Sequence, residues 1–327
     1  MNIIEIAQKF PTEIDVIKHF EKVRWGKNIK CPFCKSKNIG TRNKDFRWHC
    51  KECQKSFSVT TGTKLHDTRL PLKIWLFAFG LISDAKKGIS AKQLERNLGV
   101  HYETAWTMYH KIREMMMVEN NEVMLSDVTE IDSTFIGGKP RKFQYEKKGT
   151  PLIIPELDSQ KLEYEKMGFE FNEGIYKKPA KIGNQKRGKG VADYKETVAG
   201  IVQRGGDVFA EVVKNTNFSA LKKIIDKHVL KDDSVLLMDK DTSQVKLGKI
   251  IDNIVIDHSK MYSYNGLNTN SIESFWAIIK RQIMGQHHHV SPKLLNNYVQ
   301  EVVFKYNNRH EDDMFETLLK ISMSSNK

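Results

Sequence analysis

The sequence of 327 residues lacks the features of membrane-spanning and secreted proteins. No apolar run approaches the roughly 20 residues that cross a bilayer. The segment MNIIEIAQKF carries Glu5 and has no basic region followed by an apolar stretch, so it does not predict a secretory signal. No repeat or low-complexity tract occurs. We therefore expect a cytoplasmic protein of about two domains, with no membrane partner.

Negative charge is in the minority. The chain has 53 Lys and Arg against 40 Asp and Glu, which gives a net charge of +13 and a pI near 9.3. This balance favours a polyanionic partner, of which nucleic acid is the commonest. A lysine excess from a biased genome is the alternative.

Cysteine is scarce, and all four cysteines lie close together in the pattern C-x2-C-x15-C-x2-C: Cys31, Cys34, Cys50 and Cys53. This spacing is typical of a structural, four-coordinate Zn²⁺ site. Disulfides are the competing interpretation, and a cytosolic location disfavours them. The segment between the pairs is basic and aromatic, which predicts contact with nucleic acid, although ribbons that contact protein also occur.

Residues 70–118 show helical periodicity. LPLKIWLFAFGLI predicts a buried helix that begins near Pro71. In the next helix Ser90 is the predicted N-cap and Gly99 the residue that ends it. A further helix follows at once, so the pair predicts a helix-turn-helix. Its second helix would present these residues to a DNA major groove: His101, Tyr102, Glu103 and Thr104. An ordinary helical core without DNA contact is the alternative.

After about residue 127 the pattern becomes α/β. Strands are predicted for VTEIDSTFIGG, for two segments within residues 196–213, for SVLLMD and for IDNIVIDHS. Helices are predicted for FSALKKIIDKHVL, for the segment after Ser271 and for residues 291–309. Residues 144–190, rich in Lys and Glu, are predicted to be an insertion.

Three carboxylates occupy notable positions in this order of elements. Asp132 lies within a strand, Asp239 ends a buried strand and Glu273 begins a helix. This is the layout of a ribonuclease H-like domain, in which carboxylates bind Mg²⁺ (or Mn²⁺). Two such ions can activate a water or a 3′-hydroxyl and stabilise the leaving oxygen of a phosphodiester.

The segment NTNSIESFWAIIKR, which contains Glu273, has the pattern of an amphipathic helix. Its predicted core stripe is Ile272, Phe275, Trp276, Ile279 and Ile283. Helical periodicity places Glu273 beside this stripe, with Lys280 on the same boundary face, partly sheltered and able to reach a DNA phosphate. A Glu and a Lys on a solvated flank are the alternative.

Together these motifs resemble the zinc-ribbon DDE transposases of the insertion-sequence fifteen-ninety-five family. The resemblance rests on the zinc ribbon, the helix-turn-helix, IDSTFIGGK, the strand ending in Asp, NTNSIESFWAIIKR and YNNR. It implies a ribonuclease H-like core that cleaves and transfers DNA strands with Mg²⁺. The positions that match the family's three acids are Asp132, Asp239 and Glu273, and Lys280 matches its basic residue.

The sequence also departs from the family pattern. Ser133 replaces the usual Glu, and DKDTSQ replaces an Asp-Glu followed by an aromatic residue. Asp241 is therefore a rival for the second acid. Asn270 is a rival for the third, since the side-chain carbonyl of Asn can ligate a metal. The resemblance also suggests His258 near the site, and Lys139 and Arg281 beside Lys280 as DNA contacts.

We therefore expect an α/β ribonuclease H-like domain with a mixed sheet and flanking helices over residues 126–327. A zinc ribbon region (1–66) and a helix-turn-helix domain (67–125) would precede it. The expected function is that of a DDE transposase that binds terminal inverted repeats of double-stranded DNA as a homo-oligomer associated with the nucleoid. The alternatives are a catalytically silent DNA-binding protein derived from such an enzyme, or a ribonuclease H-like nuclease with another substrate.

Overall fold

The computed structural model describes residues 2–40, 46–137, 195–239, 246–256, 268–310 and 313–324. The chain forms two compact units, residues 1–134 with 198–327, and residues 135–197. The predicted insertion falls within the second unit and outside the described residues. The division into three domains stays a prediction.

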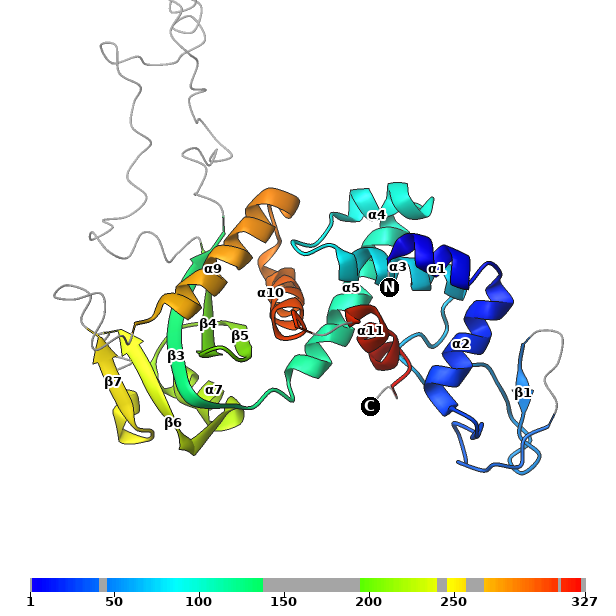
Figure 1. The fold of residues 1–327 in the computed structure, drawn as a ribbon, viewed down its shortest axis with the longest axis horizontal. Coiled ribbons are helices and arrows are strands. Elements are labelled where there is room, and N and C mark those ends of the chain that lie inside the picture. Colours follow the sequence, from blue (N-terminus) through cyan, green and yellow to red (C-terminus); the bar gives the residue numbers. More distant parts are fainter. Residues whose placement is uncertain are drawn as a thin grey trace, which may run out of the picture. The chain divides into compact units, whose positions relative to one another are not determined.

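The elements are drawn in Figure 1. The helices are α1 (Ile3–Lys9), α2 (Glu13–Trp25), α3 (Leu72–Asp84), α4 (Ala91–Leu98), α5 (Tyr102–Asn120), α7 (Phe218–His228), α9 (Asn270–Gln282), α10 (Pro292–Asn307) and α11 (Met314–Ser322), with the 3-10 turn η2 (Lys246–Lys249) and the π-turn η3 (Ile283–His287). The strands are β1 (Trp48–His49), β2 (Ser56–Phe57), β3 (Leu125–Ile136), β4 (Glu196–Gln203), β5 (Val208–Val213), β6 (Val229–Asp239) and β7 (Asn253–Ile256). Among these helices, none combines the length and the apolarity that a membrane crossing requires.

Three helices were not predicted, namely α1, α2 and α11. The first two begin at reciprocal capping boxes, Asn2 with Glu5 and Thr12 with Asp15. Their buried side chains join one core with α3, α4 and α5, and Phe315 of α11 packs into the same core. The end of the chain therefore contributes to the amino-terminal helical core.

The helices of residues 70–118 form as predicted. The Ser90 hydroxyl caps α4 by accepting from the Gln93 N–H, and Gly99 ends that helix with a left-handed φ of 65°. The helical spacing also predicts that Trp106 packs between the helices α4 and α5, and this expectation is wrong, because Trp106 is 37% exposed. Its ring instead packs against the ring of His110, one turn further along α5.

The α/β part contains a five-stranded sheet with the order β5-β4-β3-β6-β7. Strand β3 pairs in parallel with β6, and β6 pairs in parallel with β7. Strands β4 and β5 are neighbours joined by residues 204–207, a link short enough only for an antiparallel hairpin. The sheet is therefore mixed, as predicted.

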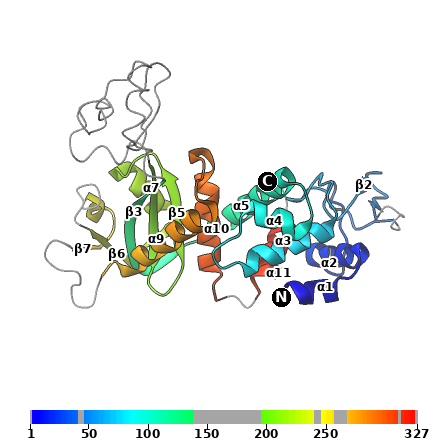
Figure 2. The same ribbon diagram turned by 90° about the horizontal axis from the view of Figure 1, so that it is seen from above.

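Helices cover both faces of this sheet, with α7 on one side and α9 on the other (Figures 1 and 2). Because side chains alternate along a strand, the buried residues divide between the faces. Ile131, Leu236 and Met238 pack with Leu221 and Ile225 of α7. The intervening residues of β3 and β6 consequently face α9.

The helix α10 covers the edge strand β5 through side-chain amides. Asn307 accepts from the Val208 N–H and donates to its carbonyl, both at 2.9 Å. The Gln300 amide donates to the Ala210 carbonyl at 2.8 Å. These contacts satisfy backbone groups that an open edge would leave free for pairing with another chain.

A buried ionic cluster joins α5 to α10. Glu301 is fully buried and accepts hydrogen bonds from Tyr109 Oη (2.6 Å), Arg113 Nε (2.8 Å) and Lys305 Nζ (2.8 Å). The Arg113 guanidinium lies between the rings of Tyr109 and Tyr298, 3.7 and 3.8 Å from their centroids. The helical core and the sheet are thus connected by charge as well as by apolar packing.

Candidate active site and cysteine cluster

The register of the parallel strands brings two of the three predicted acids side by side. Glu130 pairs with Leu237, and Ile131 pairs with Met238. The next residues along the two strands are Asp132 and Asp239. Neighbouring strands lie about 4.8 Å apart, and both acids belong to the face that α9 covers. Both side chains are half-buried.

The third acid, Glu273, lies in the first turn of α9, where the macrodipole favours a carboxylate. The predicted core stripe of this helix is correct, because all five of its residues are buried. The expectation that Glu273 and Lys280 are partly sheltered is wrong, since both side chains are exposed. Their exposure leaves them accessible to a ligand.

The environment of Asp132 links the three acids electrostatically. Burial raises the pKa of Asp132, and the charges of Asp239 and Glu273 raise it further. A hydrogen bond from Trp276 Nε1 to Asp132 Oδ2, 3.0 Å long, acts in the opposite direction. Trp276, predicted only as a core residue, therefore also contacts the carboxylate group. Its ring lies against Gly200 of β4, where an added Cβ would approach the ring to 2.7 Å.

The three carboxylates are near one another without being in close contact. Among the described residues, the cysteines are the group whose potential ligand atoms all lie within 4.8 Å of one another. The chemistry of the carboxylates suits Mg²⁺, which prefers a few carboxylate oxygens and keeps other positions for water or phosphate.

A fourth acid, Glu130, was not predicted; it lies two residues before Asp132 and is fully buried. Its Oε1 accepts from Arg204 Nε at 2.9 Å, and its Oε2 accepts from the Ile272 N–H at 3.0 Å. Arg204 Nη2 also donates to the Asn268 carbonyl at 2.6 Å. The strand period of two, which puts Glu130 on the same face as Asp132, was the available signal.

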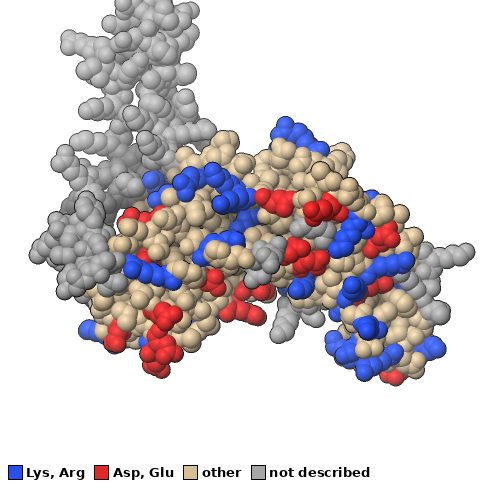
Figure 3. Space-filling model, in the orientation of Figure 1, with Lys and Arg blue, Asp and Glu red and all other residues tan. Residues whose placement is uncertain are grey.

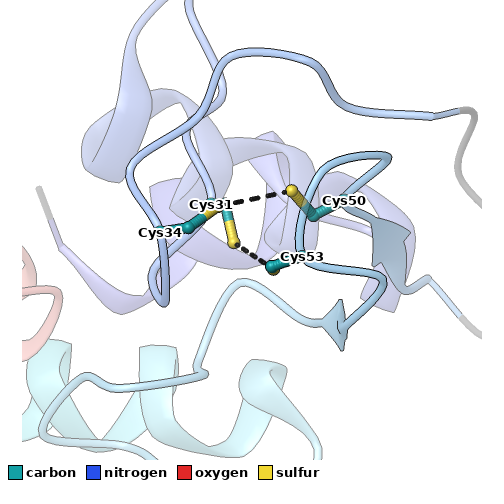
Figure 4. Close-up of side chains that lie close together, drawn as sticks. All are labelled: Cys31, Cys34, Cys50 and Cys53. Carbon is teal, nitrogen blue, oxygen red and sulfur yellow. Dashed lines mark hydrogen bonds between the residues drawn. The ribbon is translucent and has the colours of Figure 1, made fainter.

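The four cysteines converge from two loops (Figure 4). The Sγ atoms of Cys31 and Cys53 are 3.6 Å apart, and those of Cys34 and Cys50 are 3.5 Å apart. Tetrahedral Zn–S bonds of about 2.3 Å require S–S separations of roughly 3.8 Å, so the cluster fits zinc.

Basic side chains gather on the cysteine-containing segment (Figure 3, lower right). In its described residues 26–40 and 46–57, a single carboxylate, Glu52, stands against these exposed cations: Lys27, Lys30, Lys35, Lys37, Arg47, Lys51 and Lys55. Figure 3 shows a second group of basic side chains over α9. Lys280 and Arg281 are exposed residues of this helix. Both surfaces suit a polyanion.

The other predicted contacts have different outcomes. His101 and Tyr102 are exposed and Thr104 is half-buried at the beginning of α5. Asn270 is exposed, one turn before Glu273 and on the same side of α9. Three further predicted residues lie outside the described part of the chain: Lys139, Asp241 and His258.

Comparison with known families supports the resemblance. Residues 171–307 match the ISXO2-like transposase domain, and residues 11–56 match the transposase zinc-ribbon domain. The first match includes Asp239 and Glu273, and the second includes all four cysteines, whereas Asp132 precedes the first. The resemblance to the zinc-ribbon transposases of this insertion-sequence family is thereby confirmed.

Individual relatives are distant. An uncharacterized protein in transposable element ISH50 of Halobacterium salinarum (strain ATCC 700922 / JCM 11081 / NRC-1) is 24% identical over 119 residues, which are 35% of this chain and 39% of that protein. The chain therefore matches about two fifths of that relative's length. The Mos1 strand transfer complex aligns with 77% of this chain and 79% of its own at 11% identity and a TM-score of 0.22. A pre-cleavage Mos1 transpososome aligns with 76% and 79% at 11% identity and a TM-score of 0.19. Such low scores do not establish a common fold.

Proposed function

We propose that the chain is a DDE transposase that cleaves the ends of an insertion sequence and joins them to target DNA. The observation that carries this proposal is the placement of Asp132, Asp239 and Glu273 on one side of the sheet, close enough for their charges to interact. The transposase-domain match over two of these acids supports it.

The three carboxylates would hold the divalent cations of the reaction. When bound, Mg²⁺ or Mn²⁺ supplies activation of a water or 3′-hydroxyl and neutralises charge on the phosphodiester. Asp132 and Asp239 offer oxygens from adjacent strands, and Glu273 adds one from an exposed helical turn. The Trp276 N–H holds the Asp132 carboxylate in a fixed orientation.

Different parts of the chain would contact different features of the DNA. The ribbon and the α4–α5 pair would bind the terminal repeats, with His101, Tyr102 and Thr104 toward the major groove. Lys280 and Arg281 would contact phosphates beside the carboxylates. Joining two ends requires at least two active sites, so the active complex would be a homo-oligomer.

The test is cleavage of DNA that carries the element's own ends, with purified zinc-loaded protein and Mg²⁺ or Mn²⁺. We expect strand nicking at the end sequence, and we expect Asp132→Asn, Asp239→Asn and Glu273→Gln each to abolish it. The matched control is Asp226→Asn, because Asp226 is an exposed carboxylate of the same α/β part, paired with Lys231. This control is expected to keep full activity.

Two outcomes would overturn the assignment. Nicking that survives Asp239→Asn and Glu273→Gln would remove these residues from the catalytic group. Salt-sensitive, end-specific binding without cleavage at any Mg²⁺ or Mn²⁺ concentration would instead identify a silent DNA-binding protein. Asp241→Asn and Asn270→Ala, compared in the same assay, decide between the rival positions.

A further inference from the structure

Glu130 is a buried acid in the α/β part whose environment differs from that of the three carboxylates. It is 0% exposed, whereas Asp132, two residues further along β3 and on the same face, is half-buried. An ionised side chain at such a position is costly unless it is paired and hydrogen-bonded. The groups that are hydrogen-bonded to Glu130 therefore indicate its role.

Both carboxylate oxygens of Glu130 are occupied by protein donors. Oε1 accepts from Arg204 Nε at 2.9 Å, and Oε2 accepts from the Ile272 N–H at 3.0 Å. To act as a further metal ligand beside Asp132, Asp239 and Glu273, Glu130 would need a carboxylate oxygen that is accessible to the ion and directed toward it. Burial and these two bonds argue against Glu130 as a further ligand.

The contact with Ile272 takes the place of a helix cap. The N-cap residue of α9, Thr269, makes no side-chain capping bond. The Ile272 N–H is one of the amino-terminal groups without a partner inside the helix. Glu130 supplies that partner from strand β3, and its negative charge suits the positive end of the helix. Ile272 directly precedes Glu273, so the bond fixes the turn that presents the third carboxylate.

Arg204 extends this connection to the segment before α9. Its guanidinium donates through Nε to Glu130 and through Nη2 to the Asn268 carbonyl, at 2.6 Å. Its own backbone N–H donates to the Val128 carbonyl at 2.9 Å, which anchors it to β3. One planar side chain thus ties the strand of Asp132 to the entry of the helix of Glu273.

We propose that Glu130 and Arg204 form a positioning pair that sets the distance between Asp132 and Glu273. The pair binds neither metal nor DNA; it holds the helix turn that carries the third ligand against the strand that carries the first. This inference rests on the proposed function, because it assigns the pair to the site formed by Asp132, Asp239 and Glu273. Outer residues that orient ligands in this way commonly change metal affinity by about 10–100-fold when they are substituted.

The test measures Mn²⁺ affinity of the zinc-loaded full chain without DNA, by electron paramagnetic resonance, well below the unfolding temperature. Glu130→Gln keeps the shape but leaves an amide N–H facing one of the two donors. We expect it to weaken Mn²⁺ binding by about 10–100-fold and to speed hydrogen exchange in the first turn of α9. Arg204→Lys keeps the positive charge but loses the planar guanidinium that donates to both Glu130 and Asn268. We therefore expect it to weaken Mn²⁺ binding by a smaller factor.

The control variant is Asp226→Asn, which breaks an exposed ion pair of the same part of the chain and should leave Mn²⁺ affinity unchanged. Unchanged affinity in both Glu130→Gln and Arg204→Lys, with loss of affinity in Asp239→Asn, would overturn the positioning role and leave the proposed function standing. Loss equal to that of Asp239→Asn, without faster exchange in α9, would make Glu130 a ligand instead. If wild-type protein binds Mn²⁺ no better than Glu273→Gln, the metal site fails and this inference fails with it.

Discussion

The indole N–H of Trp276 donates a hydrogen bond of 3.0 Å to the Asp132 carboxylate. The donor lies in α9 and the acceptor in β3. Most of the sequence of the α/β part lies between these two residues, although their side chains are in contact. The bond ties the first acid to the helix that carries the third. It also opposes the effects of burial and neighbouring negative charge on the pKa of Asp132.

Trp276→Phe should keep an aromatic ring in the core, remove this hydrogen bond, and lose the packing of Trp276 Cη2 against Gly200, because phenylalanine lacks that atom. A hydrogen bond to the ionised form lowers a carboxyl pKa, so its loss raises the pKa of Asp132. We expect the acidic limb of the cleavage rate to move to higher pH, and the rate to fall about tenfold, as for other residues that orient a ligand. A pH–rate profile measures both.

The control for this variant is Trp75→Phe. Trp75 is 3% exposed, and its indole donates to Thr68 Oγ1 at 2.8 Å in the helical core. Its substitution should cost about 1 kcal/mol of stability and leave the acidic limb in place. An equal displacement of the limb in both variants would show that the effect is not specific to Asp132.

Glu301→Gln should destabilise the protein in a pH-dependent way. Burial alone would raise the pKa of Glu301, but Lys305 and Arg113 outweigh it and hold the pKa well below its usual range. A lowered pKa stabilises the fold above the ordinary glutamate value of 4.5, and this contribution is lost as the pH falls below it. We expect a loss of about 3–5 kcal/mol at pH 7, which shrinks in acid.

Denaturant unfolding at several pH values measures this loss. Glu95→Gln breaks the Lys92–Glu95 surface pair of α4 and should change stability by less than about 1 kcal/mol at any pH. A loss in Glu301→Gln that stays constant from pH 7 to pH 3 would contradict the assignment of charge to this cluster.

Cys50→Ser should remove one of four converging ligands and with it the metal. Structural zinc commonly contributes about 10–16 kcal/mol of binding free energy to small domains, so the ribbon should unfold locally. Zinc content after dialysis should fall from one ion per chain to near zero. Glu52→Gln, a neighbour that offers no ligand to the cluster, should retain the ion; its loss there would point to a site other than the four cysteines.

Lys280→Ala should weaken binding to all DNA sequences similarly. A lysine that contacts one phosphate releases about one counterion, so the slope of log K against log salt should decrease in magnitude by about 0.9. Titrations at several salt concentrations measure this slope. Lys320→Ala, an exposed lysine of α11, should leave it unchanged. If both variants share one slope with wild type, Lys280 does not contact phosphate.

Local patterns in the sequence determined much of this protein. The cysteine spacing specified the cluster, because two short loops bring four thiols together wherever the rest of the chain lies. Ser90 and Gly99 marked the ends of α4, since caps act on the residues beside them. The apolar stripe of α9 and the strand that ends at Asp239 followed from helical and strand periodicity. The capping boxes of α1 and α2 were equally local, and they were overlooked.

Only the tertiary structure decided which distant residues meet. The β3–β6 register places Asp132 beside Asp239, and a shift of one residue would turn one acid to the opposite face. Glu130 and Glu301 read in the sequence as ordinary charged residues, because acids are usually exposed. Their burial depends on cations and backbone donors contributed by other elements. Periodicity sets the face on which a side chain lies, whereas long-range packing selects its partner.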